Sequence, residues 1–303
     1  AQMRIEHHRF ENVLFGKSYV YRADGEDIRS YTSDVKPVNK NYRRFGAGDS
    51  LRITLIDDWL LAKTSYEYTA RLPNEDEVFG DAVLVYANLE LRPELSHNLN
   101  QELQLDLRRT RYGDFWAMVN LFTRWSDELI FLLGQDRFSQ YQNVYSARSF
   151  GVESAFKWTS PKRYVTLDGN LTVTDLRNTS TQGVFAKFDG DRVPNRPWLH
   201  ASWGALLYFS NVLMRGDSIE PFYQGRYVKS FARSWESVGS STFKRYIPDQ
   251  TSHTLGLTYA VRAFATRLFG TFEVQNLTNA ALFDSYGLQR PGRGYFFKLS
   301  GEI

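Results

Sequence analysis

Residues 50–69 read SLRITLIDDWLLAKTSYEYT and decide the fold class of this chain. On both sides of the polar pair Asp57-Asp58, an apolar or aromatic residue stands at nearly every second position, as in Leu51, Ile53 and Leu55. Successive side chains of a β-strand point to opposite faces, so this period of two indicates strands with one apolar and one polar face. The stretch therefore predicts an antiparallel hairpin with a short turn.

The same hairpin unit recurs along the rest of the sequence. Further alternating stretches lie near residues 103–121, 150–173, 199–229, 255–274 and 295–303, with a less regular one near 11–22. Together they predict an all-β protein with about twelve antiparallel strands.

The connections between these strands alternate between two kinds. Short turns are predicted near residues 56–58, 111–114, 159–163, 212–217 and 262–266. Long polar segments are predicted near residues 24–41, 72–98, 127–142, 177–197, 231–252 and 277–291. Short turns on one side and long loops on the other are typical of outer-membrane β-barrels.

A soluble β-sandwich is an alternative, because its strands alternate in the same way. The distribution of charge favours the membrane interpretation. A Lys or Arg on a lipid-facing position costs about 2–4 kcal/mol at the bilayer midplane, so charge is expected on one face of each strand. In these strands it is largely confined to one face.

Composition supports the barrel and excludes several other classes. Of the 303 residues, 16% are aromatic, whereas the mean hydropathy is only −0.44. The absence of Cys excludes disulfide frameworks, zinc ribbons and thiol nucleophiles. The net charge of +3 includes no block of Lys or Arg that would indicate nucleic-acid binding. Apolar runs such as 129–133 are far shorter than the roughly 20 residues of a transmembrane helix.

Several segments resemble a known family. SYEYTARLP at 65–73, EVFGD at 77–81 and NLELRPELSHN at 88–98 resemble the barrel of TonB-dependent outer-membrane receptors, most of all the Bacteroidetes type. Gly151-Val152-Glu153 and VPNRPW at 193–198 are similar to recurrent strand segments of that family. NLTN at 276–279 and PGRG at 291–294 are similar to the signature before its closing strand. These matches run in family order from about residue 60 onward.

The resemblance implies a barrel of about 22 strands in the bacterial outer membrane, with an N-terminal plug in its lumen. It also implies import of a scarce nutrient, such as a siderophore, cofactor, glycan or peptide, with energy delivered by the TonB complex. Neither a plug nor a TonB box is recognisable in this sequence. We therefore expect residues 1–303 to be the C-terminal portion of such a barrel. Its expected partners are the plug and N-terminal barrel half, lipid and lipopolysaccharide, and TonB through the missing part, with a surface lipoprotein as a further candidate.

Two alternatives to an importer stay open at this stage. An even number of strands would allow an autonomous twelve-stranded barrel to close, as in a small diffusion porin. A structural or adhesive barrel would have kept the receptor scaffold without transport.

Substrate contacts are expected from the long loops and the inward-facing rim, because aromatic residues and Arg dominate recognition surfaces. The candidates are Trp125, Tyr141, Tyr145, Arg233, Trp235, Lys244, Arg245, Tyr246 and Tyr286. Loop packing or contact with lipopolysaccharide would explain these residues equally well.

Charged residues on the polar faces are expected to face the lumen and to contact a plug or water, since a charge inside a barrel needs a partner or solvent. They are Arg52, Lys63, Glu67, Glu102, Asp106, Arg108, Glu153, Lys157 and Asp168.

No catalytic, metal-binding or cofactor motif is recognisable. The five His residues show no metal-ligand spacing, and no Gly-x-Ser-x-Gly element is present. Asp189-Gly190-Asp191 and residues 24–27 could supply oxygen ligands for calcium, although turns explain both more simply. We expect neither an enzyme nor a bound cofactor.

Overall fold

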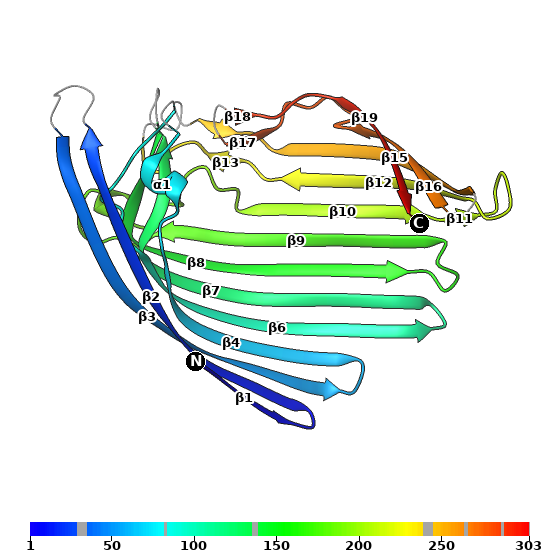
Figure 1. The fold of residues 1–303 in the computed structure, drawn as a ribbon, viewed down its shortest axis with the longest axis horizontal. Helices are drawn as coiled ribbons and strands as arrows, with labels where there is room; N and C mark the ends of the chain where they lie inside the picture. Colours follow the sequence, from blue (N-terminus) through cyan, green and yellow to red (C-terminus); the bar gives the residue numbers. More distant parts are fainter. Residues whose placement is uncertain are drawn as a thin grey trace.

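One long, curved antiparallel sheet dominates the computed structural model, which describes residues 1–28, 35–81, 84–134, 139–238, 245–263, 266–285 and 288–302 (Figure 1). Thirteen long strands within these residues follow one another across the sheet in chain order. They are β1 (Gln2–His7), β2 (Phe10–Ile28), β3 (Val35–Ile56), β4 (Leu60–Arg71), β6 (Glu94–Thr110), β7 (Gly113–Gly134), β8 (Ser139–Thr159), β9 (Val165–Asn178), β10 (Leu199–Leu207), β12 (Ser218–Val228), β15 (Gln250–Ala263), β16 (Thr266–Gln275) and β19 (Gly294–Glu302).

Shorter elements lie in the connections between the long strands. They are α1 (Glu75–Phe79), β5 (Val85–Tyr86), the 3-10 helix η1 (Ala186–Phe188), β11 (Phe209–Ser210), β13 (Phe231–Ala232), β14 (Tyr246–Ile247), β17 (Phe283–Ser285) and β18 (Leu288–Gln289). β5 pairs in parallel with β8, and β11 pairs with β12. β13 with β14, and β17 with β18, form two small separate sheets.

The register gives the main sheet two distinct faces, as the alternation predicts, because residues paired across neighbouring strands share a face. One row runs through Glu11, Arg52, Lys63, Glu102, Asn120, Glu153, Thr172 and His200. The adjacent row runs through Phe10, Ile53, Ala62, Leu103, Val119, Ser154, Leu171 and Ala201. We call the first the polar face and the second the apolar face.

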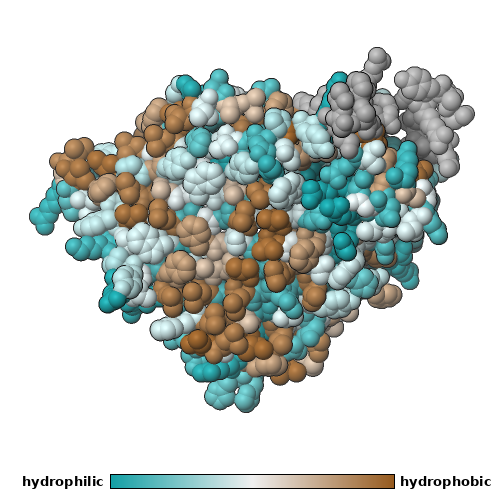
Figure 2. Space-filling model, turned by 180° about the vertical axis from the view of Figure 1, so that it is seen from behind, coloured by the Kyte–Doolittle hydropathy of each residue, from teal (hydrophilic) through white to brown (hydrophobic). Residues whose placement is uncertain are grey.

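Large side chains on the apolar face are exposed, among them Leu103, Val119, Phe156 and Phe272. Figure 2, seen from behind, shows brown hydrophobic side chains gathered over the strands. Monomeric soluble proteins rarely expose large contiguous apolar patches, whereas a barrel wall presents one to lipid. None of the described helices is long and apolar enough to cross a membrane.

Two of the predicted long loops are mostly strand. β2 and β3 stay paired as far as Ile28 and Val35, inside the predicted segment 24–41. β7 and β8 stay paired as far as Gly134 and Ser139, inside the predicted segment 127–142. The alternation of apolar and polar residues ends where the apolar face ends, whereas backbone hydrogen bonding continues beyond it. Strand length was therefore underestimated from the side-chain pattern.

The sheet is open at β1 and β19, which no pairing among the described residues joins. In a series of thirteen antiparallel strands, the first and the last run in the same direction, so they cannot be antiparallel neighbours. The alternative of a self-closing twelve-stranded barrel is therefore contradicted. The additional strand is β1, whose six residues are too few for a clear alternating pattern.

Buried apolar clusters lie at the end of the sheet that carries the long connections. One combines Val78, Leu89 and Leu91 of the β4–β6 connection with Val38 and Ile130 of the strands. A second is formed by Phe131, Val144, Phe185, Val193 and Trp235. A third is formed by Val228, Phe231 and Ile247. The long connections are thus folded against the strand ends, and they build the site described next.

Candidate functional site

The connection between β4 and β6 begins with a capped helix. The Asn74 side chain accepts a hydrogen bond from the backbone N–H of Glu77 (2.8 Å), and the Glu77 carboxylate accepts one from the backbone N–H of Asn74 (3.0 Å). This capping box satisfies free N–H groups at the start of α1. Further along, the Asn88 side chain donates to the carbonyl of Tyr141 (2.7 Å), which attaches the connection to β8.

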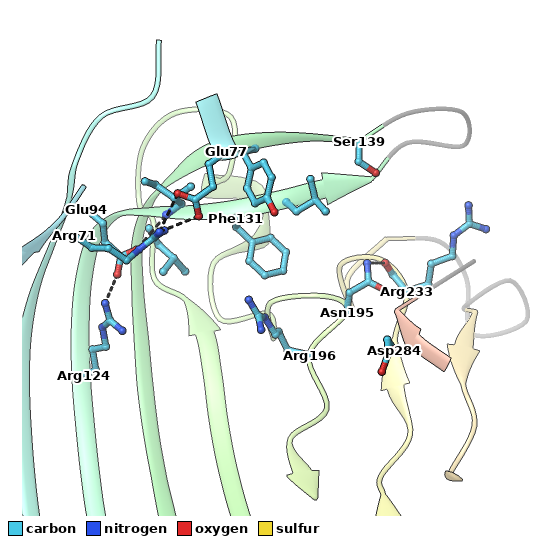
Figure 3. A pocket seen from close by; sticks show the side chains of 14 residues that line it. Arg71, Glu77, Glu94, Arg124, Phe131, Ser139, Asn195, Arg196, Arg233 and Asp284 are labelled. Atoms are coloured by element: carbon cyan, nitrogen blue, oxygen red, sulfur yellow. Dashed lines mark hydrogen bonds and ion pairs between the residues drawn. The ribbon is translucent and has the colours of Figure 1, made fainter. Parts of the chain in front are cut away.

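An ion cluster fixes the same connection to the polar face of the sheet (Figure 3). Arg71 donates to Glu77 (2.9 Å) and to Glu94 (3.2 Å), and Arg124 also donates to Glu94. Glu94 is only 1% exposed and accepts a further hydrogen bond from the backbone N–H of Ile130 (3.4 Å). A buried carboxylate needs such partners. Through these arginines, Glu94 therefore ties α1 to the end of β4, the start of β6 and the middle of β7.

A cavity of about 580 Å³ opens beside this ion cluster. The cluster and the β7–β8 hairpin form one wall, which includes Phe131 and Tyr141. The opposite wall is formed by Asn195, Arg196 and Arg233, from the connections that follow β9 and β12, together with Asp284 of β17. Figure 3 shows Arg196 facing Phe131 across the space between these walls. The cavity thus joins parts of the chain that are far apart in sequence.

Arg196 makes the cavity electropositive. Its guanidinium lies 5.4 Å from the centroid of the Phe131 ring and forms no ion pair with any described residue. Arg71 and Arg124 are neutralised by the two glutamates of the ion cluster. Asp284 accepts a hydrogen bond from Arg290 (2.7 Å), whose guanidinium holds the pKa of that carboxyl below its usual value. An exposed cation beside an aromatic ring is suited to bind an anion or a planar group.

A second cluster of polar contacts lies at the same end of the sheet, between the end of β12 and the start of β15. Asp249 accepts hydrogen bonds from Lys229 Nζ (2.9 Å), the Tyr227 hydroxyl (2.7 Å) and the backbone N–H of Ser230 (2.7 Å). Lys229 first, and then Tyr227, hold the pKa of Asp249 well below its usual value. The aspartate therefore stays charged and closes the base of the 229–249 connection.

Two of the predicted substrate-contact residues, Tyr141 and Arg233, line the cavity. Trp235 is 7% exposed and stacks on Phe188, with ring centroids 4.8 Å apart, so it packs the connection. Tyr246 lies on β14, and Arg245 accepts a backbone hydrogen bond from Arg233 (3.0 Å). That Trp235, Tyr246, Arg245 and the two cavity residues take part in substrate binding stays a prediction.

The other predicted contacts lie elsewhere. Trp125 was expected near a loop but lies on β7, on the apolar face, because β7 continues well past it. Tyr145 is likewise a strand residue, of β8, the strand that also carries Tyr141 of the cavity wall. The side chain of Tyr145, and the whole of Lys244 and Tyr286, lie outside the described residues.

Sequence reasoning missed Arg196, Asn195 and Phe131. The first two belong to the VPNRPW segment, which was used only for the family resemblance. An Asn-Arg pair between two prolines, in a connection without alternation, was an available signal for an exposed functional cation. Phe131 lies in the apolar run 129–133, which was considered only as too short for a transmembrane helix and which the structure places in β7.

The nine charged residues predicted to face the lumen all lie on the polar face, the face of the ion cluster. Several are paired there: Lys63 contacts Glu102 (2.6 Å), and Arg108 contacts Asp106 (2.7 Å). Glu67 is paired with Lys17 (2.6 Å). That this face borders a lumen or a plug stays a prediction.

Within the part of the chain that the structure describes, no group of three or more His, Asp or Glu side chains is arranged to hold a metal ion. Asp191, one of the residues considered for calcium, accepts a hydrogen bond from the backbone N–H of Ser237 (2.7 Å). This contact links the connection that follows β9 to the connection that follows β12.

Comparison with known proteins identifies the family. The family model described as TonB dependent receptor-like, beta-barrel, matches residues 5–277. The chain belongs to this family. The members of this family are transporters of the bacterial outer membrane rather than enzymes. No curated protein sequence matches the chain.

Solved structures share the fold. The ferric preacinetobactin receptor BauA from Acinetobacter baumannii aligns with a TM-score of 0.69 and 16% identity over 97% of this chain and 40% of that chain. The copper transporter OprC aligns with a TM-score of 0.68 and 16% identity over 96% and 45%. The FrpB iron transporter from Neisseria meningitidis (F5-1 variant) aligns with a TM-score of 0.68 and 13% identity over 99% and 44%. This TonB-dependent receptor chain spans less than half the length of these structures.

Proposed function

We propose that this chain forms part of the barrel wall of a bacterial outer-membrane receptor that imports a scarce nutrient with TonB-derived energy. Membership of the family supports transport, and the exposed apolar face supports a position in a membrane. The observation that carries the proposal is the electropositive cavity at the long-connection end, on the polar face. There it would receive cargo from outside the cell.

The cavity favours an anionic cargo with planar groups. Arg196 supplies an unneutralised guanidinium, and Phe131 and Tyr141 supply rings. Among siderophores, cofactors, glycans and peptides, an anionic siderophore chelate fits this combination best. The solved structures of the same fold include the ferric preacinetobactin receptor BauA and the siderophore receptor PiuA, both from Acinetobacter baumannii.

The same proposal includes the rest of the barrel and the partners of this chain. Residues 1–303 would be the C-terminal portion of the barrel, of the Bacteroidetes type, with a plug against the polar face and TonB acting through that plug. Paired charges such as Lys63 with Glu102 would then border the plug or water. A surface lipoprotein would be an additional partner at the long-connection end.

The two alternatives have less support. A small porin needs a closed barrel, and the described strands form an open sheet. A purely adhesive barrel would not need an electropositive cavity between folded connections.

Uptake by cells that express the whole receptor tests the proposal. The probes are a labelled ferric catecholate, ferric citrate, cobalamin, an oligosaccharide and a peptide, each given to cells with and without the TonB complex. We expect one probe to accumulate only when TonB is present, and Arg196→Gln to lower its uptake about tenfold, the loss of one charge-assisted contact. Lys162→Gln, in the short turn at the opposite end, is the matched control and should not change uptake. TonB-independent accumulation, or accumulation of none of the probes, would contradict the proposal.

A further inference from the structure

The short turn between β11 and β12 exposes three consecutive apolar side chains. Residues 211–217 read NVLMRGD, and Val212, Leu213 and Met214 are 49%, 72% and 54% exposed. Turn geometry is satisfied by Gly, Asn, Asp and Ser, so it does not explain why large apolar residues stand at this position. A run of exposed apolar residues marks a surface that contacts something other than water. We call residues 211–217 the apolar turn.

One carboxylate holds the apolar turn in place. Asp217 is only 2% exposed, and its Oδ1 accepts a hydrogen bond from the backbone N–H of Val212 (2.8 Å). Its Oδ2 accepts hydrogen bonds from the backbone N–H groups of Leu213 and Met214 (3.0 Å each). The backbone beneath the three apolar side chains is therefore already ordered, and little backbone entropy is left to lose when they bind.

The same carboxylate directs the apolar turn toward the apolar face of the sheet. The Tyr259 hydroxyl donates a hydrogen bond to Asp217 Oδ2 (3.1 Å). Tyr259 is two residues from Leu257, an exposed member of the apolar face, so the two side chains share that face. Asp217 therefore draws the turn to the outside of the wall, away from the polar face and the cavity.

Exposed apolar side chains join the apolar face to the apolar turn. Leu207 of β10 and Phe209 of β11 are exposed, and Phe209 is paired with Ile219, the residue opposite Tyr259. Residues paired across neighbouring strands share a face, so Phe209 continues the apolar face as far as the turn. Tyr164, in the adjacent short turn, is also exposed. Aromatic residues are enriched where a membrane protein meets the headgroups.

A cation stands beside the apolar residues. Arg215 is exposed and forms no ion pair with any residue that the structure describes. A long basic side chain can leave its stem in an apolar layer while its guanidinium reaches a phosphate. The apolar turn therefore combines three side chains suited to acyl chains with one suited to a headgroup.

We propose that the apolar turn is a preformed membrane anchor: Val212, Leu213 and Met214 insert among the acyl chains of phospholipids in the periplasmic leaflet, and Arg215 contacts a lipid phosphate. This inference rests on the proposed function, which places the short turns on the periplasmic side of the outer membrane. Continuity with the apolar face favours lipid over a protein partner, because the surface that leads into the turn is the one that faces lipid.

Site-specific fluorescence of the whole receptor tests this inference. This chain contains no Cys, so one cysteine is introduced at a time, any cysteine elsewhere in the receptor is replaced, and the site is labelled with nitrobenzoxadiazole. The receptor is folded into phospholipid vesicles, and heat-modifiable mobility in electrophoresis verifies each variant. We expect a label at Leu213→Cys to be quenched by nitroxide-labelled phospholipid and shielded from aqueous iodide. Lys162→Cys, in the exposed short turn between β8 and β9, is the matched control and should be quenched by iodide.

A second variant tests the role of the carboxylate. Asp217→Asn replaces one of the two acceptor oxygens by an N–H donor and so removes part of the hydrogen bonding that holds the turn. Combined with Leu213→Cys, it should abolish quenching by the nitroxide lipid and admit iodide. Lipid quenching that Asp217→Asn leaves unchanged would overturn the assignment of a preformed anchor.

A label at Leu103→Cys, on the apolar face, separates this inference from the proposed function. If the nitroxide lipid quenches the label at Leu103 while iodide reaches the label at Leu213, the anchor is refuted and the proposed function is unaffected. If iodide reaches the label at Leu103 as well, the membrane position on which the proposed function depends is wrong. Iodide access to Leu213 in vesicles that is lost in isolated outer membranes would assign the turn to a protein partner and also refute the anchor.

Discussion

At the scale of single residues, Glu94 is the most consequential side chain of the site. It is almost fully buried and receives hydrogen bonds from Arg71, Arg124 and the backbone of Ile130. Glu94→Gln leaves two guanidinium groups without their shared carboxylate. We expect a loss of about 2–3 kcal/mol, below the cost for fully buried pairs because both arginines are partly exposed. Limited proteolysis measures this loss: the connection at residues 72–93 should be cleaved faster in Glu94→Gln than in wild type.

Glu90→Gln is the matched control for that substitution. Glu90 pairs with Lys40 (2.6 Å) but is 52% exposed, and exposed pairs contribute about 0–1 kcal/mol. Equal proteolysis of the two variants would show that burial of Glu94 is not what holds the connection in place.

Asp249 predicts a pH dependence of the 229–249 connection. Its pKa in the folded chain is lowered, by Lys229 first, so its contribution to stability is present above the ordinary carboxyl pKa of about 3.9 and is lost only as pH falls through the lower folded value. The protection factor of the Ser230 amide, which is the ratio of the intrinsic to the observed exchange rate at the same pH, should therefore be high and unchanged from pH 7 to pH 5. Asp249→Asn should lower this protection factor across that range. A change in the wild-type protection factor between pH 7 and pH 5 would contradict this assignment.

At the scale of elements, β6 tests the two faces of the sheet. Leu105 is paired with Leu60 and Ala117 on the apolar face, whereas Gln104 lies on the polar face. Leu105→Arg should cost about 2–4 kcal/mol and impair membrane assembly, whereas Gln104→Arg should be tolerated. Folding into lipid vesicles, followed by denaturant titration, measures both. Similar losses in the two variants would refute the assignment of faces.

The sequence predicted that the strands exist, but it did not predict how long they are. The hairpin at residues 50–69 was predicted because lipid on one side and polar surroundings on the other impose a period of two. The parts of β2, β3, β7 and β8 at the long-connection end have no alternation of apolar and polar residues. Backbone pairing alone extends these strands. Consequently Trp125 and Tyr141, expected near loops, belong to strands.

At the scale of the whole molecule, the fold class and family followed from the sequence, and the cavity did not. Its walls meet because apolar clusters fold the long connections onto the strand ends, which brings Arg196 to Phe131. No local pattern encodes that contact. Trp235 shows the limit of residue type as a signal: a tryptophan in a polar connection suggested recognition or loop packing equally, and the structure places it in an apolar cluster.

The shared direction of β1 and β19 has an arithmetic consequence for assembly. A ring in which every neighbour is antiparallel closes only with an even total of strands, and thirteen are contributed by the described residues. Any polypeptide that completes the ring must therefore bring an odd number. For a total of about 22, as in plugged outer-membrane transporters, the complement is about nine strands.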